Sequence, residues 1–343
     1  MLTRRFTPFL RRCLALALLG LLLTARPAWS QPLRLQVLPG NIASLYPFLS
    51  VEQGFYKQAG LDVQIVAMNS GVQASSAMAS KSIDVIMNMP DNMILLKQRG
   101  FNSVVIMGNA VQFPFFLIAA DQPDLKIAQK SYTEILPQLK DRTVGVYGLG
   151  TSTDRFVQQL VRGAGLPDNY LNRTATGGPA QTLAMLKTGK MSLFSDVYAS
   201  GLLAEQMGLG KIILDCAHVA CPDTIEKGSK MALAYFTRDD YLAQNPDHIR
   251  RLVQAHALAD AWMRQPENQP ALLAALKKLL PVPDIAEPER YYEQVAQRVP
   301  EFFGLKVSLS ALQAIQQGLL EAGEIPAPMD MTDMIWAQAD RAD

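Results

Sequence analysis

Segments with strand-like and helix-like hydrophobic patterns alternate along most of this chain, and this alternation restricts the possible folds more than any other feature. Strands are expected at 33–38, 61–67, 83–87 and 104–107, with helices between them. After an apolar extended segment at 113–120, a second series has strands expected at 143–147, 171–175, 191–195 and 211–215. Strands that alternate with helices pair in parallel through helical crossovers. The sequence therefore predicts an α/β fold.

The two series resemble each other internally, and a helical region follows them. Residues 70–87 and 177–194 share the order of a glycine turn, a small-residue helix, a basic turn and a strand. One more extended run is expected at 231–237, and the tail has helices expected at 247–264, 270–280, 288–299 and 309–321. Two similar lobes would face each other across a cleft at the carboxyl ends of their strands, where ligands of open α/β sheets bind.

The segment 143–156, TVGVYGLGTSTDRF, predicts a strand, a glycine turn and the start of a helix. Thr151, Ser152 and Thr153 follow Gly150 at the expected helix N-terminus, where unpaired N–H groups favour an anionic or strongly polar ligand group. The alternative is that this pattern is ordinary punctuation between a strand and a helix. A dinucleotide-binding fingerprint is disfavoured, because Thr153 stands where its third glycine is needed.

The first 30 residues predict a secretory signal peptide. Four arginines precede an apolar core at 13–23, and Ala28-Trp29-Ser30 fits a cleavage site before Gln31. Removing this segment leaves 27 basic and 31 acidic residues, a formal charge of −4. Nucleic-acid binding relies on concentrated positive charge, so this class of partner is not expected.

Two cysteines remain after the signal peptide, Cys216 and Cys221, and in an oxidising compartment they predict a local disulfide. A zinc site that recruits His218 is the alternative. The chain has no His-Glu-x-x-His motif, no Gly-x-Ser-x-Gly elbow and no Cys–His pair with catalytic spacing. We therefore expect a protein that is not an enzyme and needs no cofactor.

Four motifs in a fixed order carry a resemblance to a known family. They are SLYPFLSVEQGFYKQAGLDVQIV (44–66), SGVQASSAMASKSIDVI (70–86), LKDRTVGVYGLGTSTDRFVQQLVRGAGL (139–166) and TGGPAQTLAMLKTGKM (176–191). In this order the chain resembles the periplasmic substrate-binding proteins of ABC importers for nitrate, sulfonates, taurine and thiamine-pyrimidine precursors. The resemblance implies a two-lobe, type II periplasmic binding fold with a helical C-terminal tail. Hinge crossings are expected near 113–117 and 234–239, with 31–112 plus 238–343 in lobe one and 113–237 in lobe two.

The resemblance also implies ligand contacts from three loops, and two further contacts are expected at the carboxyl ends of strands. The contacts implied by the resemblance are Asn41, Ser44, Tyr46, Ser70, Gly71, Gly150, Thr151, Ser152 and Thr153. The two from the strand ends are Asn88 and Tyr198, for which helix capping is the alternative. The expected ligand is a small organic anion or a polar heterocycle: a sulfonate, an aromatic acid or a pyrimidine.

A family member of this kind is a periplasmic monomer that delivers its ligand to the membrane permease of an ABC importer. Two alternatives share the fold. One is an enzyme that acts on a pyrimidine or chorismate-like compound, and the other is a ligand-sensing module that docks on a membrane receptor. The signal peptide and the missing catalytic motifs argue against the enzyme.

Overall fold

The computed structural model describes residues 31–112, 115–120, 131–283 and 285–343. The expected signal peptide at 1–30 and Phe113, the first residue of the expected hinge crossing, lie outside the described residues. Within those ranges, no helix has both the length and the apolar character that crossing a membrane would require.

The first of two five-stranded sheets has the order β2-β1-β3-β10-β4. Its strands are β1 (Leu33–Val37), β2 (Val63–Ala67), β3 (Val85–Asn88), β4 (Ser103–Ala110) and β10 (Leu233–Arg238). Strands β1, β2 and β3 pair in parallel, and β10 runs antiparallel to both β3 and β4. The last strand in the sequence, β10, therefore lies inside the sheet, between β3 and β4.

The second sheet repeats this arrangement with the order β7-β6-β8-β5-β9. Its strands are β5 (Phe115–Ala119), β6 (Thr143–Val146), β7 (Asn172–Ala175), β8 (Leu193–Val197) and β9 (Lys211–Leu214). Strand β5 is antiparallel to β8 and β9, as β10 is in the first sheet. The internal similarity of the two series in the sequence thus corresponds to one topology used twice.

Two expectations need correction. The alternating pattern predicted parallel pairing, but each sheet is mixed, because one strand of each is supplied by a connection between the two sheets. The expected boundary at residue 237 assigned the extended run 231–237 to lobe two. Residues 233–238 instead form β10 of the first sheet, where Tyr235 pairs with Met87 on one side and Met107 on the other.

The helices lie close to their expected positions. Those before residue 113 and after residue 238 are α2 (Leu45–Glu52), α3 (Phe55–Gln58), α4 (Gly71–Ala79), α5 (Pro90–Gln98), α11 (Asp239–Gln244), α12 (Pro246–Met263), α13 (Gln269–Leu279), α14 (Pro288–Phe302) and α15 (Leu309–Glu321). The others are α6 (Tyr132–Ile135), α7 (Ser152–Gly163), α8 (Pro179–Lys187), α9 (Tyr198–Gln206) and α10 (Asp223–Gly228).

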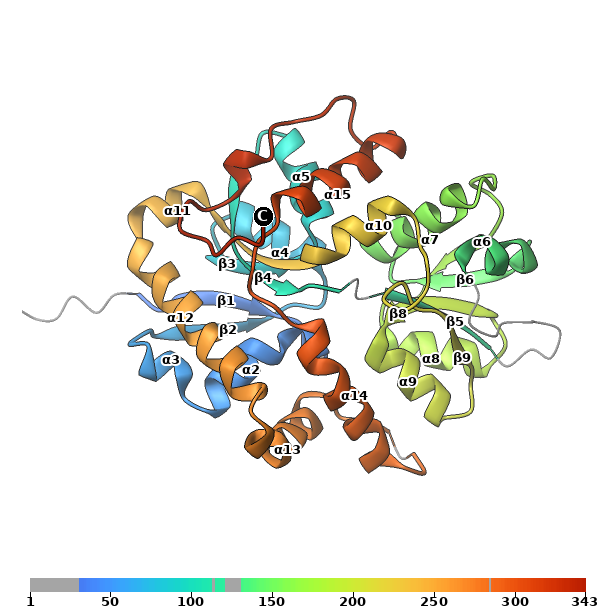
Figure 1. Cartoon of the computed structure of the whole chain (residues 1–343), viewed down its shortest axis with the longest axis horizontal. Helices are drawn as coiled ribbons and strands as arrows, with labels where there is room; N and C mark the ends of the chain where they lie inside the picture. The colour runs from blue at the N-terminus through green and yellow to red at the C-terminus, as the bar shows by residue number, and fades with distance from the viewer. Residues whose placement is uncertain (1–30, 113–114, 121–130, 284) are drawn as a thin grey trace, which may run out of the picture. The chain divides into compact units, whose positions relative to one another are not determined.

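Helices cover both faces of each sheet, so each sheet is the middle of three layers. The first sheet packs one face on α2, α3, α12, α13 and α14 and the other on α4, α5 and α15, as Figure 1 shows. The second sheet packs one face on α6, α7 and α10 and the other on α8 and α9. Strands buried on both faces read as continuous apolar runs, and all five residues of β5, FFLIA, are buried. This arrangement leaves the loops at the strand ends to form a site.

Candidate functional site

The turn that follows β3 is built around the buried side chain of Asn88. Its Nδ2 donates hydrogen bonds to the carbonyl oxygen of Gly71 at 3.1 Å and to Ser75 Oγ at 2.8 Å. A Cβ atom on Gly71 would lie 2.3 Å from Asn88 Oδ1, so only glycine allows this close approach. Ser70 caps the helix by accepting from the backbone N–H of Gln73 at 3.2 Å. Asn88 therefore fixes the N-terminus of α4 to the end of β3.

The same asparagine begins a path of hydrogen bonds from the first sheet to the second. Asn92 donates from Nδ2 to Asn88 Oδ1 at 3.0 Å and to Ser152 Oγ at 3.4 Å. Ser152 Oγ in turn donates to Asp91 Oδ1 at 2.9 Å. The N-termini of α4 and α7, which the sequence predicted to face each other, are thus linked through side chains of α5.

The glycine-hydroxyl turn before α7 holds its own shape with its side chains. Gly150 has a φ angle of +75°, and its N–H donates to Asp154 Oδ2 at 2.8 Å. Thr151 Oγ1 donates to the carbonyl oxygen of Gly148 at 2.7 Å, and Thr153 Oγ1 accepts from the N–H of Tyr147 at 3.0 Å. These bonds stabilise the turn, while the first-turn amides of α7 have no partner within the helix.

Arg155 joins α7 to two elements of the first sheet's half of the chain. Its Nη1 lies 3.1 Å from Asp91 Oδ2, and its Nε lies 2.8 Å from Glu324 Oε2, just beyond α15. Burial opposes the charge of the guanidinium, but the two carboxylates raise the pKa of Arg155 overall. Arg155 is therefore part of an ion-pair network with Asp91 and Glu324.

Three predicted contacts near β1 have partners away from this path. Asn41 caps a short turn by accepting from the N–H of Ala43 at 2.9 Å. Ser44 is buried, and its Oγ both accepts from the N–H of Leu38 and donates to its carbonyl oxygen, each at 2.9 Å. Tyr46 is fully buried and donates to Asp260 Oδ1 on α12 at 2.6 Å. The fold does not bring Ser44 and Tyr46 to the α4–α7 site.

A second polar group lies at the end of β8. Asp196 is fully buried, and its Oδ1 accepts from the hydroxyl of Tyr147 and from the N–H of Val197, both at 2.6 Å. Burial raises the pKa of Asp196 to about 6, although these bonds and the nearby Ser200 hydroxyl oppose the shift. Tyr147 was expected only to end a strand, and nothing in the neighbouring sequence indicates that its hydroxyl reaches this carboxylate.

Tyr198 lies beside Arg298 of α14. The guanidinium carbon of Arg298 is 4.4 Å from the centroid of the Tyr198 ring, and Nη2 is 2.8 Å from Asp215 Oδ2 after β9. This cation–π contact and ion pair tie α14, which packs on the first sheet, to the second sheet. Sequence reasoning missed Arg298 because it lies 100 residues beyond Tyr198 in a helix with no distinguishing motif.

Two small cavities lie beside these arginines. One, of about 30 Å³, is lined by Asp91, Ser152 and Arg155 with residues of α10 and α15. The other, of about 20 Å³, lies between Tyr198 and the Arg298 face of α14. Each volume suits about one water molecule. An organic ligand therefore needs the segments around these cavities to separate before it can enter.

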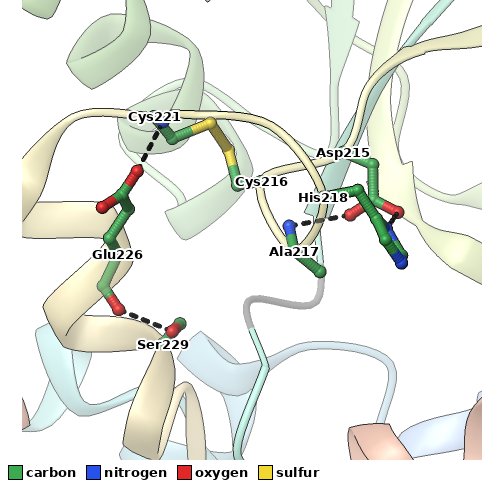
Figure 2. Close-up of a disulfide and its surroundings, with 7 residues drawn as sticks. All are labelled: Asp215, Cys216, Ala217, His218, Cys221, Glu226 and Ser229. Atoms are coloured by element: carbon green, nitrogen blue, oxygen red, sulfur yellow. Dashed lines mark hydrogen bonds and ion pairs between the residues drawn. A yellow bond between two sulfur atoms is a disulfide. The ribbon is translucent and has the colours of Figure 1, made fainter. Parts of the chain in front are cut away.

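The loop after β9 contains a disulfide between Cys216 and Cys221, whose Cα atoms lie 5.5 Å apart, so the two thiols are not zinc ligands (Figure 2). Within this loop His218 Nδ1 lies 2.7 Å from Asp215 Oδ2, and Glu226 accepts from the N–H of Cys221 at 2.8 Å. The disulfide thus braces the segment that presents Asp215 to Arg298.

Replacing both cysteines by serine is expected to lower the free energy of unfolding by about 2 kcal/mol, because a loop this short restricts the unfolded chain only modestly. Urea unfolding of the variant and of the oxidised wild type measures the difference. Reducing agent should lower the wild type to the stability of the variant and leave the variant unchanged. Equal stability of all samples would contradict the prediction.

Comparison with known proteins adds to this geometry. Residues 41–269 match the model of the family described as NMT1/THI5 like. No curated protein matches the chain significantly. Among solved structures, the periplasmic aliphatic sulphonate binding protein SsuA of Escherichia coli is 18% identical with a TM-score of 0.71, over 92% of this chain and 94% of that one.

Two other structures share the fold at similar distance. The alkanesulfonate-binding protein SsuA of Xanthomonas axonopodis pv. citri, bound to MOPS, is 13% identical with a TM-score of 0.71, over 90% of this chain and 99% of that one. The nitrate-binding protein NrtA of Synechocystis is 17% identical with a TM-score of 0.68, over 88% and 84%. The two mixed sheets are therefore those of the periplasmic binding protein fold, and the chain belongs to the NMT1/THI5-like family.

Proposed function

We propose that this protein is the extracytoplasmic solute-binding component of an ABC importer. It captures a small organic anion or polar heterocycle between two lobes and delivers it, as a periplasmic monomer, to a membrane permease. The family match and the shared fold support this proposal, as do the names of the related structures, which bind sulfonates and nitrate. Because β10 belongs to the first sheet, we place residues 31–112 and 233–343 in lobe one and 115–232 in lobe two.

The observation that carries the proposal is the side-chain path from Gly71 through Asn88 and Asn92 to Ser152. It joins two helix N-termini, one from each lobe, and helix N-termini attract anionic and polar groups. A ligand placed between them makes contacts with both lobes only when the lobes are closed. Such differential contacts are what a ligand needs to drive hinge closure.

The exchange of Thr151 and Ser152 for alanine tests the site. It removes the Oγ1 bond that shapes the turn and the Ser152–Asp91 bond between the lobes. The ligand for this test is the molecule that mass spectrometry identifies as co-purifying with the native protein. We expect its dissociation constant to be at least tenfold larger in the double variant than in the wild type. Isothermal titration calorimetry of the stripped protein measures this constant.

The control for this experiment is Thr188→Ala. The Thr188 hydroxyl bonds back to the carbonyl oxygen of Ala184 on exposed surface after α8, so its loss should leave binding unchanged. An unchanged constant in the double variant would refute the site. A bound molecule that returns with altered mass after incubation would instead identify an enzyme.

A further inference from the structure

One oxygen of the Asp196 carboxylate, Oδ2, accepts no hydrogen bond within the described part of the chain. Asp196 is 0% exposed, and Oδ1 receives hydrogen bonds from Tyr147 and from the backbone of Val197. Oδ2 has no partner within hydrogen-bonding distance among the residues that the structure describes, although the nearby Ser200 hydroxyl favours the charged carboxylate. A buried carboxylate oxygen without a donor is costly, and native proteins seldom keep one without a role.

Asp196 lies near one of the two cavities, although its own side chain is fully buried and does not line either of them. It lies one residue before the end of β8, at the carboxyl edge of the second sheet, where ligands of such sheets bind. It lies two residues before Tyr198, which with Ala199 lines the cavity beside α14. Burial is the main cause of the raised pKa of Tyr291 on α14, and the nearby Tyr292 and Asp196 add to it.

The charges around the two cavities favour a ligand that donates hydrogen bonds. Each cavity has one arginine in its lining, and each arginine already pairs with a carboxylate: Arg155 with Asp91 and Glu324, and Arg298 with Asp215. A ligand whose only polar group is an anion would have to displace these pairs and would also meet Asp196. A ligand N–H group would instead supply the donor that Oδ2 lacks.

We propose that Asp196 is a specificity-determining residue that accepts a hydrogen bond from an N–H group of the ligand. The ligand class is a polar heterocycle that carries N–H donors, such as an amino-substituted heteroaromatic ring. Tyr147 holds Oδ1 and so orients Oδ2 toward that group. This inference rests on the proposed function, because it assigns a contact within the same interlobe site.

Two pairs of six-membered-ring probes test this assignment. Benzamidine and 2-aminopyrimidine present N–H donors, whereas benzenesulfonate and benzoate present anions of similar size. In thermal-shift titrations of the wild-type protein, we expect at least one N–H probe to raise the melting temperature and both anions to leave it unchanged. The proposal would be overturned if an anion bound and neither N–H probe did. It would also be overturned if none of the four probes bound.

The Asp196→Asn variant provides the second measurement. Its amide oxygen can still accept from Tyr147, so the variant should fold and melt at or above the wild-type temperature without ligand. It should bind the stabilising N–H probe at least tenfold more weakly. Asp168→Asn, which removes a carboxylate that is 68% exposed, is the matched control and should bind like the wild type.

The outcomes separate this inference from the proposed function. If a probe binds equally to the wild type and to Asp196→Asn but loses affinity in the Thr151→Ala/Ser152→Ala variant, the interlobe site stands and the role of Asp196 is wrong. If Asp196→Asn melts well below the wild type, Oδ2 has a structural partner and the proposal is overturned. Equal binding to all variants contradicts both.

Discussion

Replacing Arg155 by alanine is expected to lower the free energy of unfolding by about 3 kcal/mol. The Arg155 and Asp91 side chains are each only 11% exposed, and Glu324 is 30% exposed. Removal of the guanidinium leaves Asp91 without its buried counter-charge, and an unpaired buried charge costs far more than a surface ion pair contributes. Urea unfolding at neutral pH measures the loss.

Arg162→Ala is the matched control, since it lies on the same helix and pairs with Asp168 near the surface. We expect its loss to stay below about 1 kcal/mol. Equal losses in the two variants would show that Arg155 contributes no more than a surface residue. In that case the ion pairs between the two sheets would not stabilise their junction.

The second large effect concerns His256, whose replacement should change how stability depends on pH. His256 lies fully buried on α12, with Nε2 2.9 Å from the Tyr56 hydroxyl. Burial lowers the pKa of His256 from 6.5 to about 3, so the folded state holds the neutral ring. Below about pH 6.5 His256 becomes protonated in the unfolded state but stays neutral in the folded state. Stability is therefore lost as the pH falls, by about 3 kcal/mol between pH 7.5 and 4.5.

A comparison between variants isolates this contribution. Asp196 acts in the opposite direction: burial raises its folded pKa to about 6, so the folded state takes up a proton first, and stability is gained as the pH falls through 6 toward 3.8. The double variant Tyr56→Phe/His256→Phe keeps Asp196, so that term cancels against the wild type. The stability of the wild type relative to this variant should fall by about 3 kcal/mol from pH 7.5 to 4.5.

The control is Thr188→Ala, which removes no titratable group, so its stability relative to the wild type should change little over this range. Unfolding free energies from urea titrations at the two pH values give both comparisons. A difference between the wild type and the double variant that does not depend on pH would contradict burial of a neutral His256.

Local elements of the fold followed directly from the sequence. The segment TVGVYGLGTSTDRF predicts a strand, a glycine turn and the start of a helix, and the structure has β6 at Thr143–Val146 and the first residue of α7 at Ser152. Glycines and hydroxyls mark such boundaries through forces that act within a few residues. The short helices α10 and α11 were missed, because a six-residue helix has too few turns to show a period.

Contacts between distant parts of the chain could not be predicted from the sequence. The run 231–237 was recognised as extended, but nothing near it reveals that its partners are β3 and β4, more than a hundred residues earlier. Helix α14 was expected to end at residue 299, yet it continues to Phe302 with Pro300 inside. Proline near a helix C-terminus removes only one hydrogen bond, so packing can outweigh its cost.

The sequence predicted where the backbone turns of the site lie, but not which partners its side chains contact. The turn at 148–153 and its counterpart at Ser70 and Gly71 lie at helix N-termini, as expected. Tyr46 and Arg298 show the limit, because packing alone decides that the first points to Asp260 and the second to Tyr198. A sequence pattern fixes where a residue lies along an element, and tertiary contacts fix what its side chain reaches.

The place of β10 within the first sheet has a consequence for the order of folding. The Thr237 hydroxyl donates to the carbonyl oxygen of Asp84, 153 residues away, and Leu233 pairs with Ala110. Closing the roughly 120-residue loop between these last two costs about 4 kcal/mol of chain entropy. The second sheet forms entirely from residues within that loop, so it can assemble first and shorten the effective loop. Until then β3 and β4 lack the strand that joins them, and slow completion of the first sheet is built into the connectivity of the chain.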